Sequence, residues 1–385
     1  MSKDMIRLGD VATYVNGYAF KPEDRGNVGL PIIRIQDLTG HAYDLGFYDG
    51  EYPSKIEINN GDILISWSAS LGVYVWDKGK ALLNQHIFKV VFDKVDIDKK
   101  YFVYAVRRKL DEMVMKTHGA TMKHIVKKDF DETKIPYPTM EEQIEIAKKL
   151  DKVLYIIQKR KQELELLDDL IKARFVEMFG NPYVNPLKWK KLKIKDAVTV
   201  EPQNGLYKPQ SDYVTDGSGI PILRIDGFYD GMVTDFASLK RLKCSETEKQ
   251  KYVLLEDDVV INRVNSIEYL GKCAHIKGLL EDTVYESNMM RMHFDPEYYN
   301  PVYICKLLCN QFIYDQIVNH AKKAVNQASI NQKDVLDFNI YQPPIDLQNQ
   351  FADFARQVNK SKVVVQKALD ETQLLFDSLM QQYFG

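Results

Sequence analysis

Cysteine, charge of one sign and long apolar runs are all scarce in this 385-residue sequence. Its four cysteines form no CxxC pair and no Cys/His zinc spacing, which favours reduced core thiols over a redox or metal role. The 52 Lys and Arg residues against 54 Asp and Glu, a net charge of -2, exclude a uniformly basic nucleic-acid coat but not a local basic surface. Apolar runs fall far short of the ~18 residues of a membrane span, and the first residues lack a signal-peptide pattern. We therefore expect a cytoplasmic protein with no membrane partner.

Recognisable catalytic motifs are missing as well. The sequence has no Walker A loop, no GxGxxG after a strand, no HExxH pair and no GxSxG elbow. The acidic residues Asp257 and Asp258 align with Gly61 and Asp62 ahead of a predicted strand, so we interpret them as a turn and not as paired catalytic carboxylates. The sequence predicts a protein that is not an enzyme and that binds no cofactor or metal.

One pattern occurs twice along the chain. Residues 29–35 return as 219–225, and residues 61–66 return as 257–262. From Ile125, which matches Ile330, the offset stays at 205 up to the last residue. Insertions accumulate before this point and none follows it. Variable length is typical of loops on a scaffold, whereas fixed length indicates a spacer.

The first part of each copy is rich in short strands. Apolar runs separated by clusters of Gly, Pro, Asn and Asp predict strands within it. Residues 101–116 and 301–319 have helical periodicity. The class is therefore mixed α/β (α+β), with strands predominating. The predicted strands are residues 31–35, 63–67, 72–76, 87–92, 221–225, 259–262, 271–276 and 291–294.

The second part of each copy predicts a long helix. In residues 141–178 apolar side chains repeat every seven residues, and the stripe is broken at Arg160 and Arg174. The second copy has a weaker stripe. Because the stripes and the fixed length are shared, we expect the two helices, each roughly 58 Å long, to pack on each other and not each on its own domain. The predicted helix-helix and partner interface is Ile146, Leu150, Val153, Ile157, Leu164, Ile171, Phe351, Val358, Val365, Leu369 and Phe376.

Side chains suited to DNA occur in local clusters. Amides and guanidinium groups match adenine and guanine edges, and lysines match phosphates. Arg34 and Arg224, placed inside apolar strands, are interpreted as structural. The predicted DNA-binding residues are Lys21, Asn84, Gln85, His86, Lys123, Lys127, Lys208, Asn262, Arg263, Asn265, Asn288, Arg291, Lys322, Lys323 and Gln327.

The whole arrangement resembles the specificity subunit of type I restriction-modification enzymes. The residues that carry the resemblance are the strand at 31–35, the turn and strand at 61–64, residues 135–138 leading into Glu-Glu-Gln, and the helix end at 173–182. It covers essentially the whole chain. The resemblance implies an internal pseudo-two-fold repeat: target-recognition domains at 1–138 and 181–344, joined by two long antiparallel coiled-coil helices at 139–180 and 345–385.

The resemblance also implies a function. The chain would be a non-catalytic subunit that recognises a bipartite, asymmetric site on double-stranded DNA, with helix length setting the half-site spacing. It would direct two DNA adenine methyltransferase subunits, which bind S-adenosylmethionine themselves, and ATP-dependent restriction subunits. Two alternatives stay open: the specificity module of a type II-like methyltransferase-nuclease, and a coiled-coil adaptor that binds only protein, which the net charge of -2 favours.

Overall fold

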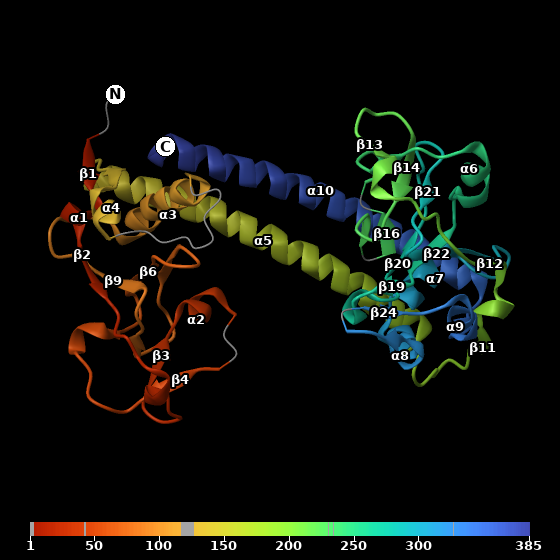
Figure 1. Ribbon diagram of the computed structural model, residues 1–385, viewed down its shortest axis with the longest axis horizontal. Coiled ribbons are helices and arrows are strands. Elements are labelled where there is room, and N and C mark those ends of the chain that lie inside the picture. The colour runs from red at the N-terminus through yellow and green to blue at the C-terminus, as the bar shows by residue number, and fades with distance from the viewer. Residues whose placement is uncertain (1–3, 42–43, 117–126, 230, 234, 326) are drawn as a thin grey trace. The chain divides into compact units, whose positions relative to one another are not determined.

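The protein is described from a computed structural model, which covers residues 4–41, 44–116, 127–229, 231–233, 235–325 and 327–385. It divides into two compact units. Unit 1 comprises Met1–Glu163 and Val365–Gly385, and unit 2 comprises Leu164–Val364. Each unit contains a strand-rich domain and part of each of two long helices (Figure 1). Among the described residues, no helix combines the length and apolarity needed to cross a membrane.

The elements of unit 1 up to the first long helix are short. In chain order they are β1 (Met5–Arg7), α1 (Leu8–Val11), β2 (Thr13–Asn16), β3 (Leu30–Ile33), α2 (Ile35–Thr39), β4 (Gly46–Tyr48), β5 (Glu57–Ile58), β6 (Ile63–Ser66), β7 (Gly72–Val75), β8 (Ala81–Leu83), β9 (Ile87–Val91), α3 (Lys99–Lys116), α4 (Lys127–Glu132), β10 (Lys134–Pro136) and α5 (Met140–Phe179).

Unit 2 repeats this plan with additions. Its elements are β11 (Lys190–Lys193), β12 (Val198–Asn204), β13 (Tyr213–Val214), β14 (Ile220–Leu223), β15 (Phe228–Tyr229), β16 (Gly231–Val233), β17 (Arg241–Leu242), α6 (Glu246–Tyr252), β18 (Val259–Asn262), β19 (Val264–Asn265), β20 (Cys273–His275), β21 (Val284–Tyr285), β22 (Met289–Phe294), α7 (Pro301–Leu308), α8 (Gln311–His320), β23 (Lys322–Lys323), β24 (Ala328–Ser329), α9 (Gln332–Asp337), β25 (Asn339–Gln342) and α10 (Ile345–Phe384).

The sheets of the two units correspond strand by strand. The antiparallel order β2-β9-β6-β7 of unit 1 matches β12-β22-β18-β20 of unit 2, where β16 and β15 extend the sheet. The parallel pair β3 and β8 matches β14 and β21. The pair β1-β10, which joins the start of the domain to its end, matches β11-β25. The duplication seen in the sequence is therefore a duplication of topology.

The central strands form where the sequence is apolar on both faces. All four residues of β6 and of β18 are buried, as a strand covered on both sides requires. Each strand follows a left-handed residue, Gly61 (φ +88°) or Asp257 (φ +67°). The carboxylates of Asp62 and Asp258 then each accept a hydrogen bond from the backbone N–H three residues earlier, at 2.8 Å. The interpretation of Asp257 and Asp258 as a turn before a strand is confirmed.

Two local predictions were wrong. The helix predicted at 301–319 is two helices, because the side chain of Asn310 accepts a hydrogen bond from the N–H of Phe312 and so begins α8. Arg34 and Arg224 lie just after strands β3 and β14 and not inside them. Arg34 is the residue before α2, where its guanidinium lies 3.3 Å from the carboxylate of Asp37.

The long helices begin and end within a residue or two of their predicted bounds.

In unit 2, Phe175 and Phe179 of α5 pack against Phe351 of α10, with ring centroids 5.4 and 5.5 Å apart. Tyr303 of α7 lies over both phenylalanines of α5. The same buried cluster includes Val259 and other residues of the central sheet, so one core joins the helices to the domain.

Candidate nucleic-acid interface

In unit 1, the turn between β8 and β9 is tied to the end of β2 by backbone hydrogen bonds. The N–H of Tyr18 donates to the carbonyl of Leu83 (2.8 Å), and the N–H of Gln85 donates back to the carbonyl of Tyr18 (2.9 Å). The N–H of Trp67, just after β6, donates to the carbonyl of His86 (3.2 Å). These segments therefore meet at one end of the central sheet, which we name loop site 1.

Unit 2 repeats this network with different residues. The N–H of Leu206 donates to the carbonyl of Tyr285 (2.8 Å), and the N–H of Ser287 donates to the carbonyl of Leu206 (2.9 Å). The N–H of Arg263, just after β18, donates to the carbonyl of Asn288 (2.8 Å). We name these segments loop site 2. Arg263 therefore occupies the place of Trp67, and Asn288 the place of His86.

A glycine makes each network possible. A Cβ at Gly17 would lie 2.0 Å from the carbonyl oxygen of Asn84, and a Cβ at Gly205 would lie 2.3 Å from that of Glu286. No side chain fits at such distances, so the Asn-Gly pairs that the two copies share are explained by a close backbone approach. The backbone of the loop sites is fixed, whereas their outward side chains differ.

Loop site 1 presents aromatic and amide groups. The Trp67 ring stacks on Phe88 (centroids 5.6 Å apart) and meets the His86 ring edge-on (5.0 Å). The Trp67 Nε1–H donates to Asn16 Oδ1 (3.3 Å), and Gln85 is exposed beside them. Packing on both sides of the indole restricts its rotamers, so this surface is preorganised for a flat partner.

Loop site 2 presents a guanidinium group and continues into a small sheet. Arg263 Nη1 donates to the carbonyl of Ser287 (3.1 Å), which directs the guanidinium along the loop. The N–H of Ile330 donates to the carbonyl of Arg263 (3.0 Å), and Asn265 pairs with Ala328 in the adjoining strands β19 and β24. The predicted residues Arg263, Asn265 and Asn288 are therefore brought together.

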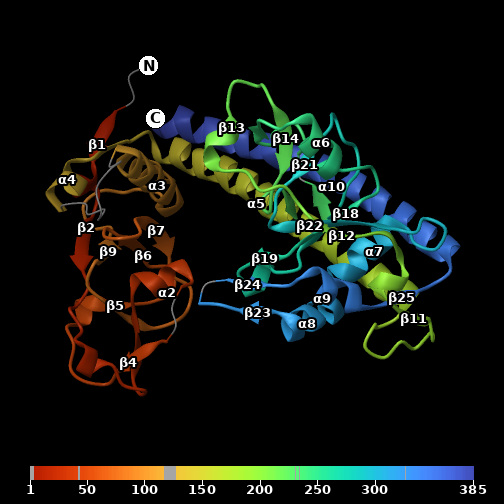
Figure 2. The same ribbon diagram turned by 45° about the vertical axis from the view of Figure 1, so that its right-hand side comes forward.

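A hairpin formed by β23 and β24 lies beside β19 (Figure 2). Strand β23 places Lys322 opposite Ser329, and both Lys322 and Lys323 are exposed. The hairpin is closed by a hydrogen bond from the N–H of Ala324 to the carbonyl of Gln327 (2.7 Å). Because β24 pairs with both β19 and β23, Lys322 and Lys323 belong to the same three-stranded sheet as Asn265, and Gln327 directly precedes β24.

Three predicted residues of unit 2 have internal partners or are covered. Arg291 Nη1 lies 3.2 Å from the carboxylate of Asp258, and their side chains are 12% and 2% exposed. Lys208 Nζ lies 2.9 Å from the carboxylate of Glu248. The backbone N–H of Ser245 and, next in size, Lys208 lower the pKa of Glu248 to about 2. Asn262 is 0% exposed, and within the described residues neither polar atom of its side chain has a hydrogen-bond partner. We leave these three out of the interface.

The remaining predicted lysines lie in unit 1. Lys127 on α4 pairs with Asp131 (2.6 Å), whereas Lys21 is exposed on the segment that leaves β2. Lys123 lies outside the described residues. Among the lysines of the predicted set that the structure describes, only those of the unit 2 hairpin adjoin a loop site.

The predicted helix-interface residues lie on the covered faces of α5 and α10. Eight of them are buried: Leu150, Val153, Ile157, Ile171, Phe351, Val358, Leu369 and Phe376. The other three are half-buried: Ile146, Leu164 and Val365.

Polar side chains also link the two long helices. In unit 1, the guanidinium of Arg160 donates to Thr372 Oγ1 and to the carbonyl of Ala368. In unit 2, Lys362 pairs with Asp168. Because a buried polar group needs its own partner, such pairs favour one alignment of the two helices over its neighbours.

Sequence reasoning missed Trp67. Trp67 and Arg263 stand at the offset of 196 that relates their two strands, so the repeat itself contained the signal. The pairing of Arg291 with Asp258 joins a residue of β22 to the turn before β18 and had no such signal.

Comparisons with known proteins agree with this geometry. Residues 2–166 match the family profile described as type I restriction modification DNA specificity domain. The chain is 23% identical to the type I restriction enzyme EcoBI specificity subunit of Escherichia coli, over 98% of this chain and 83% of the relative. It is 27% identical to the EcoKI specificity subunit of Escherichia coli strain K12, over 97% and 86%.

Solved structures show the same fold. The S subunit of a type I restriction-modification system from M. genitalium has a TM-score of 0.56 at 14% identity, with 100% of this chain and 96% of that chain covered. A chain from a structural study of complex assembly and conformational transition in the type I R-M system has a TM-score of 0.60 at 15% identity, with 100% and 98% covered.

Proposed function

The chain belongs to the family of type I restriction-modification specificity subunits, and on that premise we propose that it reads a bipartite, asymmetric sequence on double-stranded DNA. A specificity subunit is the DNA-recognition component of such a system and is not itself an enzyme. Loop site 1 reads one half of the sequence, and loop site 2 reads the other half.

One observation carries this proposal: a single backbone network is built twice and presents different side chains. Trp67 in unit 1 is replaced by Arg263 in unit 2, and His86 is replaced by Asn288. Two equal frames with unequal surfaces are suited to two unequal half-sites. A symmetric target would instead call for the same side chains in both copies.

The side chains have the chemistry of base recognition. The guanidinium of Arg263 can donate two hydrogen bonds to guanine O6 and N7, and the amides of Asn288 and Gln85 match adenine N6 and N7. Trp67 offers a flat apolar surface for a thymine methyl group. The exposed lysines of the β23–β24 hairpin would bind phosphates and set orientation without reading sequence.

The outer faces of the long helices are suited to protein partners. Tyr155, Leu374 and Leu375 in unit 1 and Leu166 and Val363 in unit 2 are large apolar side chains at least half exposed. A protein partner that covered these side chains would remove their apolar surface from water, which favours association. We assign them to two adenine methyltransferase subunits, which hold S-adenosylmethionine, with ATP-dependent restriction subunits joining the complex in the cytoplasm.

Methylome sequencing tests the assignment of half-sites. The chain is produced with the methyltransferase subunit of its own system, and the methylated motif is compared among variants. Trp67→Ala should relax only one half of the motif, and Arg263→Ala only the other. Loss of one well-formed base contact costs about 1–3 kcal/mol of discrimination, or about fivefold to 150-fold at that position. Arg241→Ala is the matched control, because its guanidinium is paired with Glu281 (2.6 Å).

Three outcomes would contradict the proposal. A motif without two separate halves would remove the bipartite site. A change in both halves by Arg263→Ala would remove the separate roles of the loop sites. Equal weakening on every sequence would make Arg263 a phosphate contact.

A further inference from the structure

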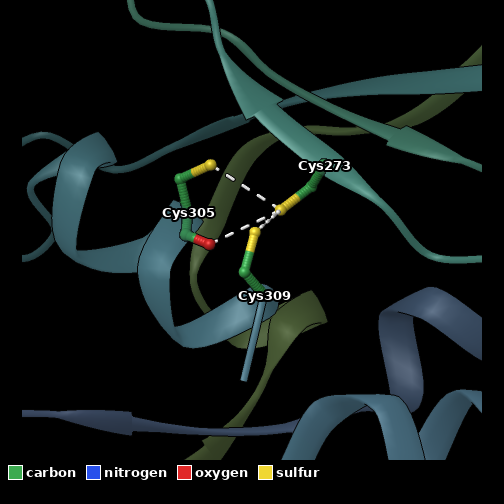
Figure 3. Close-up of side chains that lie close together, drawn as sticks. All are labelled: Cys273, Cys305 and Cys309. Atoms are coloured by element: carbon green, nitrogen blue, oxygen red, sulfur yellow. Dashed lines mark hydrogen bonds between the residues drawn. The ribbon is translucent and has the colours of Figure 1, made fainter. Parts of the chain in front are cut away.

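Three cysteine sulfurs converge in unit 2 (Figure 3). Cys273 lies on β20, Cys305 lies on α7, and Cys309 is the residue that ends α7. The Cys273 Sγ is 3.3 Å from the Cys309 Sγ and 3.6 Å from the Cys305 Sγ. All three sulfurs lie within 4.8 Å of one another. The spacing of four residues puts Cys305 and Cys309 on one side of the helix, facing the strand.

We propose that these three thiolates bind one thiophilic d10 metal ion of the zinc and cadmium class. With Zn–S bonds of about 2.3 Å, the sulfurs would stand roughly 3.8–4.0 Å apart. The observed separations of 3.3 and 3.6 Å therefore need shifts of only a few tenths of an ångström. In the described part of the chain no fourth Cys, His, Asp or Glu atom joins the group, so solvent would supply the fourth ligand.

Space and access are both present at the sulfurs. Gly231 on β16 has φ +84°, and a Cβ there would lie 3.2 Å from the Cys305 Sγ and 4.0 Å from the Cys309 Sγ. The glycine therefore keeps a side chain away from the place where an ion would lie. Cys305 and Gly231 also line a pocket of about 620 Å³, and Cys309 is exposed. An ion could reach the sulfurs by this route, as a metal site requires.

Two ammonium groups lie near the sulfurs. Lys306 interacts electrostatically with Cys305 and Cys309. Lys272 also interacts electrostatically with Cys309. Three thiolates and one divalent ion have a net charge of -1, which two nearby ammonium groups offset.

This inference differs from the expectation drawn from spacing, which was that the chain holds no metal. Cys273 and Cys305 are 32 residues apart and lie on a strand and a helix, so no sequence motif records their approach. An ion held here would link the central sheet to α7 and stabilise unit 2, because the same ligands are separated in the unfolded chain.

Cadmium titration of the full chain tests the proposal. The protein is purified under a phosphine reductant, stripped of metal with a chelator and titrated with Cd²⁺. We expect one ion per chain, an ultraviolet thiolate-to-cadmium charge-transfer band, proton release, displacement by Zn²⁺ and a higher melting temperature. Cys309→Ser and Cys305→Ser should each weaken binding by more than about a hundredfold, since loss of a supporting group alone costs up to that factor. Cys244→Ser, which changes the one cysteine outside the group, should bind like the unaltered chain.

Alkylation of the unaltered chain gives a second measurement that needs no variant. Bound Cd²⁺ should slow modification of the three clustered cysteines and leave Cys244 unaffected. The proposal is overturned by three results: no band up to millimolar Cd²⁺ with all four thiols titratable, a band that persists in both serine variants, or a Cys273–Cys309 disulfide detected as two missing thiols.

Discussion

Arg291 and Arg263 are both arginines of the second domain, and their surroundings predict opposite consequences when they are removed. Arg291 Nη1 lies 3.2 Å from the carboxylate of Asp258 and donates to the carbonyl of Val253 (2.7 Å). Arg263 donates to a loop carbonyl, and no carboxylate is paired with it among the described residues. We therefore predict that Arg291→Ala strongly destabilises unit 2, whereas Arg263→Ala changes DNA sequence preference at a smaller cost in stability.

The size of the first effect follows from burial. Removing one member of a buried ion pair costs about 3–5 kcal/mol, because the other charge stays buried without its partner. Asp258 is 2% exposed but keeps the N–H of Leu255 (2.8 Å) and the His293 ring (3.0 Å). The cost should therefore lie near the lower end, about 3 kcal/mol. In a unit of this size that loss lowers the melting temperature by about 6–12 °C.

Differential scanning calorimetry of the full chain measures this shift. Arg263→Ala is the matched control and should cost no more than about 1.5 kcal/mol, because it loses one neutral-acceptor hydrogen bond, to the Ser287 carbonyl, and leaves no buried charge unpaired. Suppose instead that Arg291→Ala melts like the unaltered chain and alters one half of the methylated motif. That result would refute the reasoning and restore Arg291 as a DNA contact.

Two further predictions concern the spacer and acid stability. Four residues are inserted in each long helix, within 161–167 and within 363–371, which lengthens each helix by about 6 Å. The gap between the two halves of the methylated motif should then grow by one to two base pairs. An unchanged gap would contradict the spacer hypothesis. Ser245→Ala should raise the pKa of Glu248 above about 2 but leave it below its ordinary 4.5, because the hydroxyl hydrogen bond is lost while the backbone N–H of residue 245 and Lys208 still contact the carboxylate. Because the pKa of Glu248 is lowered in the folded state, its carboxylate stabilises the fold fully above about pH 4.5, and this stabilisation is lost as the pH falls toward 2. The pKa is measured by NMR titration of the Glu248 carboxyl group, and the same midpoint in Ser245→Ala and in the unaltered chain would contradict the prediction.

Helices and strands could be predicted from the sequence where the pattern of buried positions determines which residues are apolar. Strand β18 was predicted residue for residue, because four consecutive buried positions admit only a short apolar run. The first long helix was predicted at 141–178 and spans Met140–Phe179, since its heptad stripe extends to both ends. In these segments the local pattern and the tertiary environment impose the same residues.

Tertiary pairing was beyond the sequence. The neighbouring sequence does not distinguish Arg291, which pairs with Asp258, from Arg263, which faces the loop. Arg291 lies within an apolar strand, and Arg263 directly follows one. The break between α7 and α8 is a different case. Asn310 is a strong helix-capping residue, so the signal was present but was outweighed by the apolar periodicity on either side.

The near-neutral charge of the chain, -2 in total, limits how strongly it can bind DNA without partners. Lys208, Arg291 and Lys127 are each paired with a carboxylate, so neighbouring negative charges offset three of the eight predicted Lys and Arg side chains. The hairpin lysines Lys322 and Lys323 remain exposed. With about three phosphate contacts, DNA affinity of the chain alone should fall by only about fortyfold between 50 and 200 mM salt, because the logarithm of affinity falls by about 0.9 per contact for each decade of salt. Fluorescence anisotropy on a duplex with the methylated motif measures this slope, and the double variant of the hairpin lysines should make it shallower. A thousandfold fall would mean that the chain already surrounds the duplex with positive charge, and a slope unaffected by the double variant would place the phosphate contacts elsewhere.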